Sequence, residues 1–559
     1  MHKNILNTKI SFILLFLFVS LSFGFKPRSH APLAGDDDIY TQINENMDVF
    51  GKVYKEVALN YLDEIDVTKF MHAGLDGMLS TLDPYTSFVD ASRKDEVDLL
   101  TTGKYGGIGI SIGQRDSSVI ITDIMDGYSA QKEGLRRGDV IMEIDNTRID
   151  VKNINDIRKL VRGPSGTTLN MKVNRNDREL NFVLTREDIQ LKNISFSGVL
   201  ENGIGYIKLE RFNKYAENEM VDALTVLKAG GATNGLILDL RDNPGGLLDA
   251  AIGILNKFVD KGDLLLTTVG RKPDSERKYF STESPMFGKD VPIIVLVNEN
   301  TASASEILSG AIQDLDRGVI LGTKSFGKGL VQVYAPLSYG NQLRITNQRY
   351  FTPSGRWIQA KNYFKENKYG VFKPLPFLNQ TEFKTLDGRT VYAEGGITPD
   401  TVVKVFENNE LLDQLQIQDA YFKFAEKYTS ENPDGSSFAM SDDVISQFYS
   451  FLNDPQFELK SKAETDAGNL SRLLVNNGYS DRAKQMAADL ESELKTERLK
   501  DFDEAKTVIK DMLEIELMKK YNKNEKDIKL VVLKDDVQVQ AALGLLKNRA
   551  VYNTLLSPR

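Results

Sequence analysis

Residues 301–307 read Thr-Ala-Ser-Ala-Ser-Glu-Ile, and Lys328 follows 25 residues after Ser303, within the stretch Ser-Phe-Gly-Lys-Gly. The three histidines of the chain all lie within its first 72 residues: His2, His30 and His72. There is no cysteine, so a cysteine nucleophile is excluded. If this segment catalyses acyl transfer, a serine paired with a lysine is the plausible combination.

Ser303 and Glu306 match the S-x-x-E capping box, and apolar residues behind them repeat at helical spacing from Ile307 to Leu315. The pattern predicts a helix that begins at Ser303. A structural N-cap is the ordinary role of such a serine. The same position also places backbone N–H groups and the positive end of the helix dipole near the hydroxyl, which suits a developing oxyanion. The spacing alone leaves both roles open.

Lys328 lies between two glycines, and residues 330–334 read as a buried strand. A lysine acts as a base when burial lowers its pKa from about 10.4 toward neutrality. On a strand, Gln332 would share a face with Lys328 and could orient its amine. For Gly-Lys-Gly taken alone, a lysine in a surface hairpin is the alternative.

Together, T-A-S-A-S-E-I and F-G-K-G-x-V-Q resemble the carboxy-terminal processing proteases, also called tail-specific proteases. The resemblance covers roughly residues 50 to 404. It implies that Ser303 is the nucleophile, Lys328 the general base and Gln332 the third member of a triad. It also implies a supporting role for Asp314, in the helix after the serine. The implied fold is a multidomain α/β protein, with a crotonase-like (ClpP-like) protease core, an inserted PDZ domain and helical regions at both ends.

A second segment supports the site. Residues 235–241 read as an apolar strand, residues 242–246 as the turn Asp-Asn-Pro-Gly-Gly, and residues 247–259 as a helix. By itself this is an ordinary turn between a strand and a helix. The resemblance implies that Gly245 or Gly246 supplies an N–H group to an oxyanion hole, together with the N–H of Ala304.

A compact module is expected over residues 99–187. Its glycine-rich stretch contains Gly106, Gly107, Ile108 and Gly109, and Gly-Leu-Arg-Arg-Gly-Asp follows at residues 134–139. This pattern resembles a PDZ domain with the permuted strand order of bacterial proteases, although a β-rich spacer is the alternative. In such a domain the glycine loop binds a chain-terminal carboxylate and a strand edge pairs with the tail. The stretch is not a dinucleotide fingerprint, because it lacks the G-x-G-x-x-G spacing.

The remaining organisation follows from composition. Two lysines precede an uncharged apolar run from Ile10 to Phe25, which predicts a secretory signal over residues 1–24 and an exported, periplasmic protein; an uncleaved membrane anchor stays open. The predicted parts are an N-terminal helical region (36–98), the PDZ domain (99–187), the protease core (188–405) and a C-terminal helical domain (406–559). The last part suits a bundle for dimerisation or stability, with adaptor docking as the alternative.

The expected function is that of an exported serine endopeptidase that recognises unstructured C-terminal tails. Its partners would be proteins with free, unstructured C-termini, and a homodimer or an adaptor protein stays open. A net charge of −9 without a basic tract argues against nucleic acid, and no ligand cluster predicts a metal or other cofactor. The alternatives are a non-catalytic PDZ scaffold on the same core and an acyl-CoA enzyme.

Overall fold

A computed structural model of the chain describes residues 36–115, 118–149, 154–175, 178–360, 381–393, 395–404, 410–454, 457, 459–521 and 523–558. The expected signal segment, residues 1–24, lies outside these ranges and stays a prediction. The chain divides into two compact units between Leu79 and Ser80.

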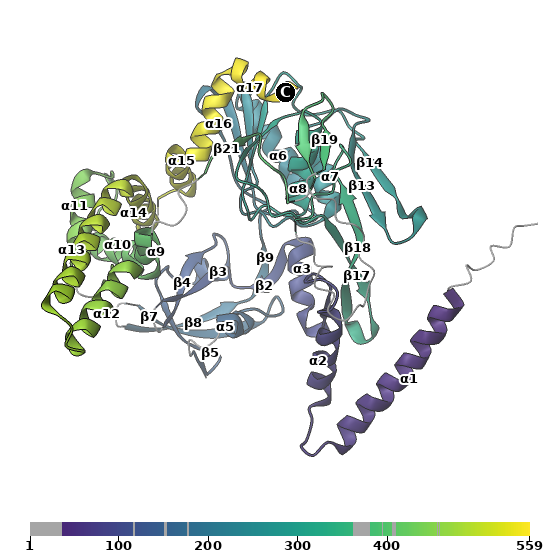
Figure 1. Cartoon of the computed structure of the whole chain (residues 1–559), viewed down its shortest axis with the longest axis horizontal. Coiled ribbons are helices and arrows are strands. Elements are labelled where there is room, and N and C mark those ends of the chain that lie inside the picture. The colour runs from purple at the N-terminus through teal and green to yellow at the C-terminus, as the bar shows by residue number, and fades with distance from the viewer. Residues whose placement is uncertain are drawn as a thin grey trace, which may run out of the picture. The chain divides into compact units, whose positions relative to one another are not determined.

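The first unit contains two helices, α1 (Asp36–Asn60) and α2 (Val67–Leu79) (Figure 1). The Tyr54 ring stacks on the Phe70 ring with 5.6 Å between their centroids, and the Tyr54 hydroxyl donates a hydrogen bond to the Val67 carbonyl. The N-terminal region was expected to be helical, and it begins with these two helices. Within the described ranges, no helix is long and apolar enough to cross a bilayer.

The second unit begins with a β-rich module around a six-stranded antiparallel sheet. Its strand order is β3-β4-β5-β7-β8, with β6 beside β5, so β3 is an edge strand. A separate pair, β2 with β9, joins the two ends of the module. The elements of this part are α3 (Lys94–Thr102), β2 (Lys104–Gly107), β3 (Ile110–Arg115), β4 (Ser118–Ile124), α4 (Ser129–Lys132), β5 (Val140–Ile144), β6 (Thr147–Arg148), α5 (Ile154–Val161), β7 (Thr168–Arg175), β8 (Arg178–Thr185) and β9 (Glu187–Gln190).

A mostly parallel six-stranded sheet forms the centre of the second unit. Only the pair β10–β11 is antiparallel in it. The inner strands are continuous apolar runs, as expected for a sheet that is covered on both faces. Its strands, in spatial order, are β10 (Ile194–Leu200), β11 (Ile204–Leu209), β12 (Gly235–Asp239), β15 (Ile293–Val297), β16 (Val319–Gly322) and β21 (Thr401–Val402).

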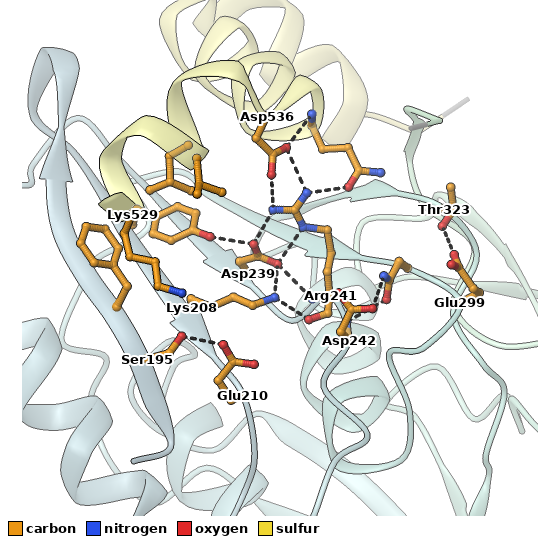
Figure 2. A pocket seen from close by; sticks show the side chains of 16 residues that line it. Ser195, Lys208, Glu210, Asp239, Arg241, Asp242, Glu299, Thr323, Lys529 and Asp536 are labelled. Carbon is orange, nitrogen blue, oxygen red and sulfur yellow. Dashed lines mark hydrogen bonds and ion pairs between the residues drawn. The ribbon is translucent and has the colours of Figure 1, made fainter. Parts of the chain in front are cut away.

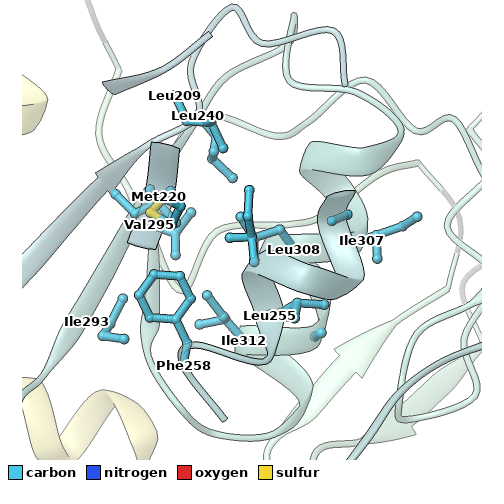
Figure 3. Packing of buried hydrophobic residues seen from close by; sticks show 14 of the residues in the cluster. Leu209, Met220, Leu240, Leu255, Phe258, Ile293, Val295, Ile307, Leu308 and Ile312 are labelled. Carbon is cyan, nitrogen blue, oxygen red and sulfur yellow. The ribbon is translucent and has the colours of Figure 1, made fainter. Parts of the chain in front are cut away.

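One face of this sheet packs against three helices, α6 (Ala216–Ala229), α7 (Leu248–Leu255) and α8 (Ala304–Asp314). Ile293 and Val295 of β15 contact this cluster, in which Leu308 and Ile312 come from α8 (Figure 3). Helix α8 is buried on all sides. The start of α8 is thereby fixed against the sheet, where the candidate nucleophile lies.

The opposite face packs against the last helices of the chain, α15 (Glu525–Asp535), α16 (Val537–Lys547) and α17 (Arg549–Leu556). Alternate residues of β15, Ile294 and Leu296, point to this side, as the two-residue period of a strand requires. The Tyr552 hydroxyl donates to the Ile293 carbonyl and accepts from the Ile293 N–H. The C-terminal helices therefore complete the central layer, in addition to forming a region of their own.

A third sheet is built around the long strand β18 (Gln342–Phe351). Strand β17 (Leu330–Pro336) pairs with β18, as do β1 (Ser87–Val89) and β13 (Leu264–Gly270), and β14 (Arg277–Phe280) pairs with β13. Strand β17 was expected to be buried, but most of its side chains are only half-buried because β17 lies at the edge of this sheet. A small pair, β19 (Glu382–Lys384) with β20 (Thr390–Tyr392), completes the strands described.

Five of the remaining helices share an apolar core rich in aromatic side chains, including Phe424 and Phe448. They are α9 (Glu410–Ile417), α10 (Ala420–Glu431), α11 (Asp442–Phe451), α13 (Asp481–Glu504) and α14 (Lys506–Lys520), and α12 (Lys462–Asn476) packs against α13. The predicted architecture, an α/β core with an inserted β-rich module and helical regions at both ends, is confirmed.

Candidate active site

Ser303 lies in a tight turn between β15 and α8. Its φ of 56° and ψ of −115° form a conformation that costs a non-glycine residue roughly 1–3 kcal/mol. The Ala302 N–H donates to the Asn243 carbonyl (3.0 Å), and the Thr301 hydroxyl donates to the Leu240 carbonyl (2.9 Å). These bonds fix the strained serine at the N-terminus of α8, where the capping pattern predicts it.

The Glu306 carboxylate is fully buried and accepts four hydrogen bonds. One oxygen accepts from the Ser325 hydroxyl and the Gly327 N–H, each at 2.6 Å. The other accepts from the backbone N–H groups of Ser303 and Lys328, each at 2.8 Å. Burial raises the pKa of Glu306, but four donating partners suit the ionised carboxylate. Glu306 therefore connects the turn that carries Ser303 to the loop that carries Lys328.

Lys328 lies in the loop before β17, with a partly buried side chain. Burial, followed by the charge of Arg344, lowers the pKa of Lys328 to about 8, whereas Glu306 and Asp83 oppose this shift. The amine is therefore partly neutral near neutral pH, as a base requires. Within the described residues, no hydrogen bond joins the Lys328 amine to the Ser303 hydroxyl. The two residues are connected through the Glu306 carboxylate, which accepts from the backbone N–H groups of both.

The segment Asp83–Phe88 contributes a wall beside Lys328 that sequence reasoning missed. The Lys328 amine lies 4.5 Å from the centre of the Tyr85 ring, and the Arg344 side chain donates to the Tyr85 carbonyl at 2.7 Å. The Asp83 carboxylate accepts from the backbone of Tyr85 (2.8 Å) and fixes the turn. Asp-Pro at residues 83–84 is a turn signal, but no local pattern could assign that turn to a lysine far along the chain.

Gln332 has a different surrounding from the one expected. Its side-chain amide donates to the Thr346 hydroxyl (3.1 Å), which donates in turn to Asp83 (3.3 Å). Strand β17 begins only at Leu330, so Lys328 lies in the preceding loop and alternation along the strand does not relate the two side chains. The expectation of a shared strand face was wrong for this reason. The assignment of Gln332 to the triad stays a prediction.

The turn at residues 242–246 lies directly against the serine. An ideal Cβ atom on Gly245 would lie 3.0 Å from the Cβ of Ser303, so a side chain has no room there. The Gly245 N–H donates to the Asn243 side chain at 2.9 Å. In the part of the chain that the structure describes, neither the Gly246 N–H nor the Ala304 N–H donates a hydrogen bond. These bonds favour Gly246 over Gly245 as an oxyanion donor beside Ala304.

Asp314, at the end of α8, lies in a separate network. Its carboxylate pairs with the buried Arg356 side chain at 2.7 Å and accepts from the Ser354 N–H at 3.0 Å. These contacts fit the supporting role that was expected for it.

The glycine-rich loop of the β-rich module joins β2 to the edge strand β3. Gly106 and Gly107 pair with β9, and the Ile108 side chain is buried in the module core. Gly109 has a φ of 81°, and a Cβ atom there would lie 2.6 Å from the Tyr128 Cβ. Among the described residues, the N–H groups of Ile108 and Gly109 donate no hydrogen bond. Two adjacent amides are therefore available beside an open strand edge.

A strained serine and a lysine whose pKa is lowered to about 8, both joined to one carboxylate on an α/β core, are typical of a serine-type hydrolase. Family models match three parts of the chain: "PDZ domain" over residues 120–175, "Peptidase family S41" over 203–366, and "Probable PDZ-protease, C-terminal helical domain" over 411–546. The core is thus that of a peptidase.

Known relatives give the family. A carboxy-terminal-processing protease of Bartonella bacilliformis is 36% identical over 316 residues, which cover 56% of this chain and 72% of that protein. A "Probable CtpA-like serine protease" of Staphylococcus aureus is 32% identical over 317 residues, 56% of this chain and 63% of that protein. The chain belongs to the carboxy-terminal-processing protease family. The predicted family, fold class and peptidase activity are confirmed.

Solved structures of related proteins are also similar to parts of this chain. A photosystem II D1 C-terminal processing protease is 26% identical, covers 64% of this chain and 92% of its own, and has a TM-score of 0.35. The PDZ domain of a carboxy-terminal protease from Vibrio cholerae, solved in complex with a peptide, is 23% identical, covers 16% of this chain and 99% of its own, and has a TM-score of 0.15.

Proposed function

We propose that this peptidase cleaves proteins behind unstructured C-terminal tails, with Ser303 as nucleophile, Lys328 as general base and Gln332 as the third member of the triad. The observation that carries the proposal is the pair of bonds from the backbone N–H groups of Ser303 and Lys328 to one oxygen of Glu306, each at 2.8 Å. If Ser303 were only a helix cap, the carboxylate of Glu306 would not need to bind the loop that carries Lys328 as well.

The reaction follows from these positions. The neutral Lys328 amine accepts the proton of the Ser303 hydroxyl while the oxygen attacks the substrate carbonyl. The N–H groups of Gly246 and Ala304 stabilise the resulting oxyanion. The protonated amine then gives its proton to the leaving peptide nitrogen, and water releases the acyl group from Ser303 by the same base. Glu306 does not exchange a proton in this scheme; it positions both residues.

The first test is the pH dependence of kcat/KM. Because neutral Lys328 is the active form and its pKa is about 8, kcat/KM should rise with pH through a midpoint near that value. The charge of Arg344 lowers this pKa, so Arg344→Gln should move the midpoint to higher pH and reduce activity at pH 7. Arg344→Lys retains the charge and should retain the midpoint, which separates the electrostatic effect from the bond to Tyr85.

Arg349, on the same strand, is the matched control, because its charge does not contribute to the lowered pKa of Lys328. Arg349→Gln should leave the midpoint unchanged. Two results would contradict a lysine base. One is a rate that stays constant between pH 6 and 9 in single-turnover conditions, and the other is a midpoint that is the same in Arg344→Gln as in the parent.

The PDZ domain is proposed to bind the substrate tail. The N–H groups of Ile108 and Gly109 would bind the terminal carboxylate, and the open edge of β3 would pair with the tail as an added strand. Gly106 and Gly107 would contribute by their lack of side chains, which lets the backbone of the loop pack closely. A Cβ atom on Gly106, for example, would lie 1.9 Å from the Gly163 carbonyl oxygen.

Amidation of the substrate terminus should raise KM by about tenfold or more, since hydrogen bonds to a charged group are lost. The change is made on the substrate because a side chain at Gly107 would meet the Tyr105 ring at 2.8 Å and disturb the fold. A short peptide with the same last residues should compete as the free acid but not as the amide. Equal KM values for the acid and the amide would show that this loop does not bind a terminal carboxylate.

Membership of a peptidase family favours catalysis over the alternative of a non-catalytic scaffold. We further propose that the protein is exported to the periplasm, on the strength of the apolar run from Ile10 to Phe25. Fractionation of cells that produce the full chain, with mass spectrometry of its mature N-terminus, tests both the export and the cleavage near residue 24.

A further inference from the structure

The C-terminal helices contact the turn that carries the proposed oxyanion donor. Asp536 is the N-cap of α16 and accepts hydrogen bonds from the N–H groups of Gln538 and Val539, each at 3.0 Å. The same carboxylate pairs with the Arg241 guanidinium, with distances of 3.0 Å and 2.7 Å to its two oxygens. Arg241 lies 295 residues earlier in the chain, just after β12.

Arg241 is almost fully enclosed by acceptors. Its side chain donates to both oxygens of Asp239, at 3.0 Å and 2.6 Å, and to the side-chain oxygen of Gln538 at 3.0 Å (Figure 2). Gln538 is itself fixed by a bond to the Val403 carbonyl (2.7 Å). A cavity of about 420 Å³ borders the guanidinium. The position of Arg241 therefore depends on these hydrogen bonds more than on close packing.

Arg241 is the second residue after β12 and directly precedes the turn at residues 242–246. Asp242 follows with a φ of 62°, and the Asn243 carbonyl accepts from Ala302 (3.0 Å) and from the Ser305 hydroxyl (3.0 Å). A shift of Arg241 would thus move the backbone that contacts both sides of Ser303. Catalytic geometry is sensitive to displacements of this kind, since a misplacement of about 1 Å can cost 100-fold in rate.

We propose that Asp536 is a positioning residue for the peptidase reaction: through Arg241, helix α16 fixes the turn that presents Gly246 to the oxyanion. Gln538 is its neutral partner. This inference rests on the proposed function, since it requires the turn to act in the reaction of Ser303. It assigns to the C-terminal helices a part in catalysis, which goes beyond the role in dimerisation or stability that was expected of them.

Two substitutions separate this role from the capping of α16. Asparagine and serine are both good N-caps, so Asp536→Asn and Asp536→Ser should retain the helix. Asparagine still offers one acceptor to Arg241, whereas serine is too short to reach it. We expect kcat to fall by about 10-fold in Asp536→Asn and by about 100-fold in Asp536→Ser, with KM close to that of the parent and the fold retained. Labelling of Ser303 by a fluorophosphonate should slow in the same order.

Lys547 provides the matched control. It joins the other end of α16 to the core through an ion pair with Glu201 at 2.6 Å, away from the turn. Lys547→Gln should leave kcat unchanged. If both Asp536 variants fold and turn over like the parent, or if only KM changes, the inference is wrong. Should Asp536→Ser fail to fold, Gln538→Leu, which removes a neutral contact to Arg241, must still lower kcat for the inference to survive.

Ser303→Ala is measured alongside these variants. Turnover in Ser303→Ala would contradict the proposed function itself. An inactive Ser303→Ala beside a fully active Asp536→Asn would contradict the positioning role alone.

Discussion

Replacing Ser303 with alanine, or Lys328 with alanine, is expected to lower turnover by at least about 10⁴-fold, because nucleophile and base act as a unit and neither retains its function alone. The measurement is single-turnover cleavage of a tailed, unstructured protein, with circular dichroism to verify folding. Combining the two substitutions should cost little more than either single one. Clearly additive losses would show that the two residues act independently.

Lys328→Arg is the sharper variant. A guanidinium stays protonated at every pH at which the protein folds, so it cannot accept the serine proton, although it preserves the positive charge. Activity in Lys328→Arg would remove the serine–lysine mechanism. Ser309→Ala is the matched control: Ser309 lies on the same helix, fully buried, and donates only to backbone carbonyls. It should leave turnover within about twofold of the parent, as substitutions outside a catalytic unit do.

Glu306→Gln is expected to produce the next largest effect. The amide group would turn an N–H donor toward two of the four donors that now face the carboxylate, and each unsatisfied buried donor costs about 1–3 kcal/mol. We expect the free energy of unfolding to fall by at least about 2 kcal/mol. Turnover should fall by about 100-fold or more, because the turn of Ser303 and the loop of Lys328 lose their common partner. Urea unfolding and single-turnover kinetics measure the two effects.

Glu464 offers a control with the same local motif. It forms a capping box with Ser461 at the start of α12, in which each residue bonds the backbone N–H of the other. Glu464→Gln makes the same change in a capping box that touches no lysine loop, so turnover should be retained. If Glu306→Gln behaves like Glu464→Gln, then Glu306 is a helix cap and nothing more.

The local parts of the site could be predicted from the sequence, and the connections between them could not. The capping pattern located the start of α8, and the glycines around Lys328 indicated a lysine with an unusual environment. The sequence did not show that Glu306 also accepts from Ser325 and Gly327, since these lie 19 and 21 residues away on another segment. A capping box has the same letters whether or not a second loop docks on its carboxylate.

Longer-range contacts were further out of reach. Arg344 bonds the Tyr85 carbonyl across 259 residues, and Arg241 bonds Asp536 across 295. Surface charges in a glutamate- and lysine-rich helical region resemble one another, so nothing marked Asp536. The face of Gln332 was missed for a different reason: β17 begins only at Leu330, so the two-residue period on which the expectation depended does not extend back to Lys328.

The placement of the last helices also affects the order in which the protein can become active during synthesis. A ribosome releases a chain from its N-terminus at roughly 5–20 residues per second, so the segment with Ser303 and Lys328 appears well before helix α17, which contains Tyr552. Until then, one apolar face of the central sheet has no cover, and Ile293 lacks the hydroxyl that both donates to and accepts from its backbone. We expect the nascent protein to be an incomplete peptidase, unable to cut its neighbours or itself before translation has passed helix α17.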